Sequence, residues 1–302
     1  MRTAIISDIH GNLEALRTVL ADIDRRSVDE IVCLGDILGY GPDPLECVDL
    51  VAERCAWSLL GNHDYAVLYE PTNFNKAAKE AAYWTRTQLD EAAERDPESG
   101  NRRLDFLNRI RPRVRYRDVY ICVHGSVRKP INEYLFETDV TNDRVKIKDV
   151  FRRIDDQVAL GDTSVCGRCL VGHTHVPGIF NWSEEDGADF THASNLGGGA
   201  VATTDPLELG STEGTKTDSS DDPFLVGRHL FDPSEKAIAN PGSVGQPRDF
   251  DERASYAILD TTRPEHQIDF FRLPYDIDSV AEKIYAISEL DDWLGDRLTE
   301  GR

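Results

Sequence analysis

The sequence is short of basic residues: 34 Lys and Arg stand against 55 Asp and Glu, which leaves a formal net charge of −21 over 302 residues. Nucleic acids and anionic membranes attract basic surfaces, so this deficit argues against a protein that binds either polyanion broadly. It does not argue against one small anion held through local metal ions. We therefore expect no nucleic-acid polymer as a partner.

Long apolar runs are missing as well. None approaches the roughly 20 residues that span a bilayer, and Asp8 ends the first apolar stretch too early for a signal peptide. We therefore expect a cytoplasmic location and no membrane partner. Hydrophobic residues nevertheless make up 40% of the chain, which is enough for a globular core. We expect one domain over residues 1–302 and leave the oligomeric state open, with a homo-oligomer allowed.

Cysteine is scarce, and its positions do not indicate a disulfide framework. The chain has 6 Cys, and Cys33 and Cys122 lie within apolar runs, as small hydrophobic residues would. Cys166 and Cys169 have the spacing of a redox motif. The motif runs into an expected strand instead of opening a helix, so we do not expect redox chemistry there.

Short apolar runs rich in β-branched residues, each followed by polar residues, predict buried strands. They occupy residues 4–6, 31–34, 57–60, 119–123 and 169–171. Amphipathic patterns between them predict helices at 13–23, 75–94 and 143–155. Strands that alternate with helices predict an α/β fold, in which ligands bind beyond the carboxyl ends of the strands.

The character of the chain changes after residue 178. Residues 181–223 contain ten Asp or Glu and one Lys, with no period of 2 or 3.6. We expect this acidic, low-complexity segment to be a mobile insertion loop, with a small lid as the alternative. Regular structure is expected to return at 237–239, followed by strands at 254–260 and 267–273. A C-terminal helix is predicted from about 278 to 298.

The polar residues at the expected strand ends carry the chemistry. They are Asp8, His10, Asp36, Asn62, His63, His124, His173 and His175. Carboxylate, imidazole and amide ligands without thiolate suit divalent ions such as Mn²⁺, Fe, Zn²⁺ or Mg²⁺. There are too many ligands for one ion, but two ions roughly 3.5–4 Å apart and bridged by a carboxylate would use them all.

We predict that three residues hold each ion and that Asp36 bridges the two ions. The first set is Asp8, His10 and His175; the second is Asn62, His124 and His173. A hydroxide shared by the ions would then attack phosphorus in line with the leaving oxygen. His63 remains outside the ligand sets and is predicted to stabilise the transition state or protonate the leaving oxygen. A carboxylate, Asp64 or Asp36, would fix its tautomer.

Each motif alone has a simpler explanation. Asp-x-His, Gly-Asp and Gly-Asn-His-Asp are all common as turns or helix caps. Gly-His-x-His is more suggestive, because alternate residues at a strand end point the same way. Independent turns would not place compatible metal ligands at the ends of five successive strands, so the motifs together favour the dinuclear site.

The sequence also resembles the calcineurin-like metallophosphoesterases. Their blocks D-x-H, G-D, G-N-H-[DE], H and G-H-x-H all occur here in order, from Asp8 to His175. The resemblance implies a four-layer α/β/β/α sandwich, the ligand roles given above and two divalent ions, of which Mn²⁺ is favoured and Fe, Zn²⁺, Ni, Co or Mg²⁺ are allowed. His124-Gly125-Ser126, residues 39–43 and residues 240–248 resemble a compact bacterial and archaeal phosphodiesterase branch that includes diadenosine-tetraphosphatase-like enzymes.

Four residues are candidates for contacts outside the metal ligands. Arg248 and Arg128 have a guanidinium that matches phosphate oxygens; the alternative is a surface ion pair, which is favoured for Arg128. Tyr40 either stacks on a base or packs its own loop. Asn12 either contacts substrate or only caps its helix.

These features predict a metal-dependent hydrolase of small phosphodiesters or nucleotides. A phosphoprotein phosphatase is the alternative enzyme, although a net charge of −21 would repel acidic phosphopeptides. A non-catalytic scaffold of the same fold is the alternative outside enzymes. A scaffold does not need His63, His10 and the complete Gly-His-x-His block, so retention of every block favours catalysis.

Overall fold

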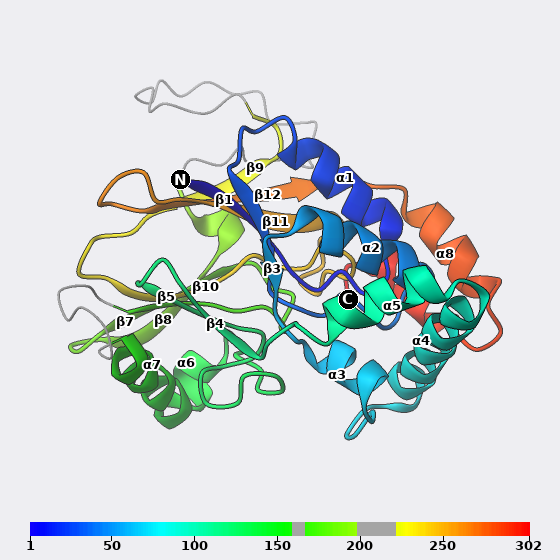
Figure 1. The fold of residues 1–302 in the computed structure, drawn as a ribbon. Helices are drawn as coiled ribbons and strands as arrows, with labels where there is room; N and C mark the ends of the chain where they lie inside the picture. Colours follow the sequence, from blue (N-terminus) through cyan, green and yellow to red (C-terminus); the bar gives the residue numbers. More distant parts are fainter. Residues whose placement is uncertain (159–166, 198–221) are drawn as a thin grey trace.

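The computed structural model describes residues 1–158, 167–197 and 222–302, and in this part of the chain two six-stranded sheets lie between layers of helices (Figure 1). The first sheet has the strand order β3 (Trp57–Ser58), β2 (Glu30–Cys33), β1 (Arg2–Ile6), β11 (Ala254–Asp260), β12 (Gln267–Leu273) and β9 (Leu225–Leu230). The second has the order β4 (Arg113–Tyr116), β5 (Tyr120–Val123), β6 (Arg168–Leu170), β10 (Lys236–Asn240), β7 (Gly178–Ser183) and β8 (Gly187–His192).

Helices cover the outer face of each sheet (Figure 1). Those packed on the first sheet are α1 (Leu13–Ile23), α2 (Pro44–Arg54), α3 (Asn62–Leu68), α4 (Lys76–Arg95) and α5 (Pro97–Leu107). The second sheet is covered by α6 (Asp139–Asn142) and α7 (Arg144–Val158). The helices α8 (Ile277–Tyr285) and α9 (Trp293–Glu300) pack beside α4, and the short 3-10 turn η1 (Ala193–Asn195) follows β8.

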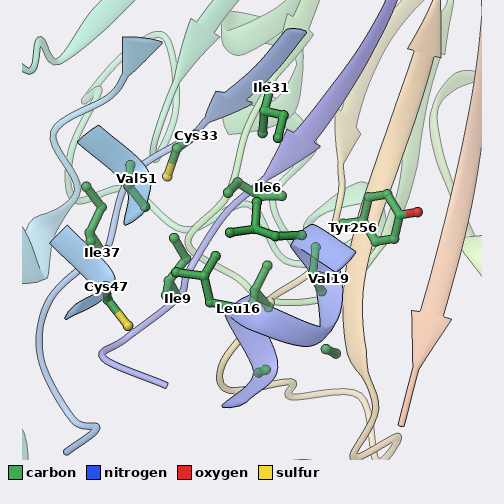
Figure 2. Close-up of a cluster of buried hydrophobic side chains, with 14 of the residues drawn as sticks. Ile6, Ile9, Leu16, Val19, Ile31, Cys33, Ile37, Cys47, Val51 and Tyr256 are labelled. Atoms are coloured by element: carbon green, nitrogen blue, oxygen red, sulfur yellow. The ribbon is translucent and has the colours of Figure 1, made fainter. Parts of the chain in front are cut away.

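The alternation of side chains along β1 explains the layers. Ile6 joins the cluster between the first sheet and its helices, where it lies near Leu16 and Val19 of α1 and Val51 of α2 (Figure 2). Ile5, its neighbour on the strand, belongs to the cluster between the two sheets, because successive strand residues point to opposite faces. Both faces of the sheet are therefore buried. The predicted α/β/β/α sandwich is confirmed.

Parallel pairing brings the functional loops together. Strand β1 pairs in parallel with β2, and β2 with β3; in the second sheet β6 pairs in parallel with β5 and β10. Their carboxyl ends are the points where the predicted ligand motifs begin. The loops after β1 and β2 are also tied directly together, since the backbone N–H groups of Ile9 and His10 donate to the carbonyl oxygen of Asp36 at 2.8 and 3.0 Å.

The prediction of an irregular acidic segment from residue 181 is wrong for residues 181–197. Here the hairpin of β7 and β8 adds two strands to the second sheet, and Trp182 and Phe190 pack against the cluster that contains α7. The acidic residues 184–186 lie at its turn, so their charge concealed the alternation on either side. The remaining part of the predicted insertion, 198–221, lies outside the described residues.

The single C-terminal helix predicted from 278 to 298 is also wrong. The chain instead forms α8 and α9, separated by residues 286–292. Val280 and Ile284 of α8 pack in one cluster with Leu294 and Leu298 of α9. The return of the chain buries the apolar side of both helices, which one straight helix could not do. Within the described residues, no helix is long and apolar enough to cross a membrane.

Candidate metal centre

The loops that carry the predicted ligands have an unusual backbone. Asp8, His10, Asp36, His173 and His175 all have positive φ, between 52° and 67°. This left-handed conformation is costly for residues other than glycine and persists only where the surrounding structure enforces it. Here it turns the chain sharply after β1, β2 and β6. Strain of this kind at five predicted ligands is typical of a functional site.

One group of ligand atoms comes from both sheets. Asp8, His10, Asp36 and His175 each offer an atom within 4.8 Å of the others, and all four side chains are buried. Nε2 of His175 lies 3.2 Å from a carboxylate oxygen of Asp8 and 3.3 Å from Nε2 of His10. The group contains the first predicted ligand set together with Asp36.

The second group shares Asp36 with the first. Asp36, His124 and His173 offer atoms within 4.8 Å of one another. Nε2 of His124 is 3.2 Å from Oδ2 of Asp36 and 3.2 Å from the amide oxygen of Asn62. The structure therefore brings all seven predicted ligands together, and Asp36 is the residue common to both groups.

The histidine tautomers are set by main-chain carbonyl groups. Nδ1 of His10, His124 and His175 contacts the carbonyl oxygens of Leu38, Leu34 and Gln246, respectively. A carbonyl oxygen can only accept, so each Nδ1 carries a proton, and in the neutral imidazoles of His10 and His175 Nε2 presents a lone pair. The Nε2 atoms of His10 and His175 then face each other as two acceptors. Such an arrangement is unfavourable unless a cation lies between them, and it is typical of metal-binding histidines.

Two further atoms favour bound cations. Among the described residues, Oδ2 of Asp36 and Nε2 of His173 are buried and have no hydrogen-bond partner. A buried polar atom without a partner costs about 1–3 kcal/mol. Both atoms belong to the second ligand group, where coordination to an ion would satisfy them. The chemistry of the donors and these unpaired atoms therefore fit divalent metal ions.

Electrostatics favour ionised carboxylates in the cluster. Burial opposes ionisation of Asp36, but the neighbouring imidazoles of His124 and His63 outweigh it and hold the pKa of the carboxyl below its ordinary value. The pKa of Asp8 is likewise lowered, by His175 and His124 against the effect of burial. Burial lowers the pKa of His10 and His173, which favours the neutral imidazole that a metal requires.

His124 differs from the other histidines. Burial lowers its pKa, but Asp36 and Asp8 outweigh this effect and raise the pKa to about 9. Without a cation, a proton on His124 therefore compensates part of the carboxylate charge. A metal ion bound at this place would replace that proton.

The segment 240–248 supports the ligand loops from behind. The side-chain amide of Asn240 donates to the carbonyl oxygen of Gly172 at 2.8 Å and to the hydroxyl of Thr174 at 2.7 Å, on either side of His173. The hydroxyl of Ser243 donates to the carbonyl oxygen of Asp8 at 2.8 Å. This segment of the sequence thus fixes the strained loops.

A family model described as calcineurin-like phosphoesterase matches residues 1–177. The chain belongs to the calcineurin-like phosphoesterase family. An uncharacterized protein of Methanocaldococcus jannaschii is 34% identical over 306 residues, which cover 99% of this chain and 98% of the relative. A solved metallophosphoesterase from Sphaerobacter thermophilus is 33% identical, with a TM-score of 0.69 and coverage of 100% of this chain and 99% of the other.

A hypothetical protein from Pyrococcus horikoshii has a TM-score of 0.64 at 14% identity, with coverage of 100% of this chain and 98% of the other, which supports the fold alone. The predicted family is confirmed. Membership and the clustered Asp and His side chains together indicate a metal-dependent phosphoesterase. The clusters suggest divalent metal ions, and their identity stays a prediction.

Asp64, the last residue of the Gly-Asn-His-Asp motif, has different contacts from those we predicted. Its carboxylate accepts four main-chain N–H groups, from Asp36, Ile37, Leu38 and Gly61, at 2.9 to 3.0 Å. Within the described residues it makes no hydrogen bond with the ring of His63. Of the two carboxylates predicted to fix the His63 tautomer, Asp64 is therefore wrong, because it joins the loop after β2 to the start of α3; the Asp36 alternative stays a prediction.

Asp64→Asn is expected to lower the free energy of unfolding by about 2–4 kcal/mol, because an amide nitrogen in place of one oxygen leaves two buried N–H groups without an acceptor. Equilibrium urea denaturation measures the change. Asp90→Asn, the same substitution at an exposed position, is expected to stay within about 0.5 kcal/mol. Equal stability of the two variants would contradict the role given to Asp64.

His63 lies at the edge of the ligand groups, as expected from its place outside the predicted sets. Its ring centroid is 4.8 Å from that of His10 and 4.2 Å from that of Tyr40, and its buried Nδ1 has no hydrogen-bond partner in the described part of the chain. A Cβ added to Gly39, which has φ +87°, would lie 2.6 Å from that Nδ1. Glycine thus leaves the space that His63 occupies. Burial, opposed by Asp36, lowers the pKa of His63 to about 4.

Two predicted substrate contacts, Asn12 and Tyr40, are buried in the structure. The side chain of Asn12 makes three hydrogen bonds: its oxygen accepts from the N–H of Ala15 at 3.1 Å, and its amide donates to Gly245 at 2.9 Å and Tyr275 at 3.2 Å. It caps α1, as the alternative had it. Tyr40 is buried, with its ring against His10 and His63. It packs its own loop and also lines a polar cavity with Asn62 and His63, so a contact with substrate stays a prediction.

The two candidate arginines, Arg128 and Arg248, differ in their carboxylate partners. Nε of Arg128 lies 3.4 Å from Glu133 and 3.7 Å from Asp149, so it is paired with carboxylates. Arg248 has no carboxylate partner among the described residues; its Nη2 donates to the side chain of Gln246 at 2.9 Å, and its Nε is buried without a partner. The side chain lies close to the ligand groups, since its charge lowers the pKa of His175 in addition to the effect of burial. Arg248 remains the candidate for a second phosphate contact.

Tyr134 is a site residue that the sequence reasoning missed. Its ring stacks on the imidazole of His173 with centroids 3.6 Å apart and an interplanar angle of 20°. It lies in the segment between β5 and α6, where no periodicity or motif marked it. The signals nearby were the motif His124-Gly125-Ser126 and the candidate Arg128.

Proposed function

We propose that this phosphoesterase hydrolyses small phosphodiesters or nucleotides with two divalent ions. The observation that carries the proposal is the pair of buried ligand groups joined at Asp36. Asp8, His10 and His175 would hold one ion, and Asn62, His124 and His173 the other, with Asp36 shared. When bound, the ions would activate a water for attack on phosphorus and neutralise charge on the phosphoryl oxygens.

The chain's own residues orient the substrate in this proposal. His63 lines a polar cavity of about 290 Å³ together with Asn62 and His173, so an ester oxygen placed there lies beside its imidazole. We assign His63 the transfer of a proton or hydrogen bond to the leaving oxygen. Arg248, which has no carboxylate partner in the described part of the chain, would bind a phosphoryl oxygen or a second phosphate.

Turnover of a substrate panel by Mn²⁺-loaded protein tests this function. We expect bis-p-nitrophenyl phosphate to be hydrolysed with a kcat/KM at least about tenfold above that of p-nitrophenyl phosphate. The reason is that a phosphodiesterase site has space for both ester substituents of the phosphorus. Cyclic nucleotides and dinucleoside polyphosphates in the same panel define the substrate class.

A phosphopeptide in the panel tests the alternative phosphatase. Chelator-treated protein is the control and is expected to be inactive until Mn²⁺ is restored. Faster hydrolysis of the monoester or of the phosphopeptide would contradict the diesterase assignment. Absence of turnover in every metal-loaded sample would favour the scaffold.

A further inference from the structure

A second cavity lies beside the metal centre and is lined largely by aromatic rings. Its volume is about 470 Å³, which lies in the range of ligand pockets. The aromatic and aliphatic residues around it are Tyr134, Leu135, Phe136, Val176, Phe180 and Phe190. Glu137 and Arg248 are its charged residues. Phe136 is 49% exposed. An apolar ring at this cavity is therefore in contact with water, which is unfavourable.

The cavity adjoins the ligand groups through three of its residues. Tyr134 stacks on His173, with ring centroids 3.6 Å apart. Thr174, which also lines the cavity, stands between the two histidines of the Gly-His-x-His block. Arg248 lies two residues after Gln246, whose carbonyl oxygen contacts Nδ1 of His175. A group bound in this cavity would therefore lie next to a phosphate at the metal centre.

Tyr134 also lines the polar cavity that contains His63, and it is the one residue common to the linings of these two cavities. The chemistry of the two cavities differs. The polar cavity is lined by Thr72 and four asparagines beside the rings of Tyr40 and Phe74, whereas the other is lined by four aromatic rings and no asparagine. Tyr134 and Phe136 are themselves stacked, with centroids 5.1 Å apart and nearly parallel planes at 7°. Tyr134 thus stacks with both His173 and Phe136, and Phe136 is the most exposed of these rings.

We propose that the aromatic cavity binds a planar aromatic group, such as a nucleobase. This group belongs to the substituent that stays on phosphorus when the other ester bond of the phosphodiester is cleaved. This inference rests on the proposed function and names its substrate class. The leaving alcohol would occupy the polar cavity beside His63. Water adds to phosphorus, the bond from phosphorus to the leaving oxygen breaks, and that oxygen takes a proton. The products are an alcohol and a phosphomonoester that keeps the aromatic group.

Two diesters with the same leaving group test this inference. Thymidine 5′-(p-nitrophenyl phosphate) and methyl p-nitrophenyl phosphate both release p-nitrophenolate and differ only in the retained substituent. Stacking of a base on protein rings is expected to raise kcat/KM of Mn²⁺-loaded protein for the thymidine ester at least about tenfold over the methyl ester. The inference concerns this ratio, so differences in metal loading between preparations cancel.

Phe136→Ala removes a ring of the cavity, and we expect it to lower the ratio at least about fivefold, mainly through KM for the thymidine ester. Tyr69→Ala is the matched control: Tyr69 is 59% exposed and lines neither cavity, so the ratio should be unchanged. Binding of thymidine 5′-monophosphate, measured by calorimetry, should weaken in Phe136→Ala and remain in Tyr69→Ala.

The possible results distinguish failure of the aromatic subsite from failure of the proposed phosphodiesterase function. A wild-type ratio near one, or a ratio that Phe136→Ala leaves unchanged, would overturn the aromatic subsite while diester hydrolysis stands. Absence of turnover with both esters would contradict the proposed function and the inference together.

Discussion

Asp36→Asn is expected to reduce the bound metal from two ions per chain to one or fewer and to lower kcat by roughly 10²–10³-fold. Asp36 belongs to both ligand groups, and its Oδ2 lies 3.2 Å from Nε2 of His124 and 3.7 Å from Nε2 of His10. An amide nitrogen in place of Oδ2 has no lone pair for a cation. The substitution therefore removes the shared ligand while it keeps the shape of the side chain.

The fold should survive this change, because Oδ1 of the amide can still accept the N–H of His63, now 2.8 Å from the carboxylate. Metal content is measured by mass spectrometry after loading and desalting, and turnover on bis-p-nitrophenyl phosphate. Asp90→Asn carries the same chemical change at an exposed position and should retain metal and activity. Full metal occupancy in Asp36→Asn would contradict the shared-ligand assignment.

His63→Ala is expected to lower kcat by roughly 10²–10⁴-fold, the range of a general acid, while metal content remains that of the wild type. The residue lines the polar cavity but belongs to neither group of ligands. Loss of turnover with retained metal would thus separate catalysis from metal binding. Metal content and kcat for the diester are measured on the same preparations.

His229→Ala is the matched control for this variant. His229 lies on β9, its Nε2 is 2.8 Å from a carboxylate oxygen of Glu235, and it lines neither cavity. A further test uses leaving groups of different pKa. If His63 protonates the leaving oxygen, the variant should lose most activity on esters of poorly acidic alcohols and least on p-nitrophenyl esters. Equal losses on both would argue for a role in orientation alone.

The sequence was sufficient to predict which residues meet at the site, because the motifs sit directly beyond strands. Each strand end fixes a point at the sheet edge, and Asp8 and Asp36 follow β1 and β2 by only two and three residues. Short connections leave little freedom, so the positions of the ligands follow from the strand order. A short motif next to a strand end therefore predicts where its side chains lie in the fold.

Contacts between distant segments could not be predicted in this way. Asp64 stands next to His63, and that adjacency suggested shared chemistry; its carboxylate instead accepts N–H groups that are 26 to 28 residues away. Since α3 begins at Asn62, successive side chains in its first turn point in different directions. Asn12 is similar, because its bond to Gly245 spans 233 residues.

The aromatic cavity shows the same limit. Tyr134 comes from the segment before α6, Phe190 from a hairpin whose acidic turn hid its alternation, and Arg248 from the loop after β10. None of these segments has a pattern that indicates the others. Only the packed fold brings them to one side of His173, so the subsite is a property of the structure.

Anomalous diffraction from crystals loaded with Mn²⁺ tests the central claim most directly. We expect two peaks roughly 3.5–4 Å apart, one beside Asp8, His10 and His175 and the other beside Asn62, His124 and His173, with Asp36 in contact with both. A single peak, or two peaks of which only one contacts Asp36, would contradict the dinuclear centre.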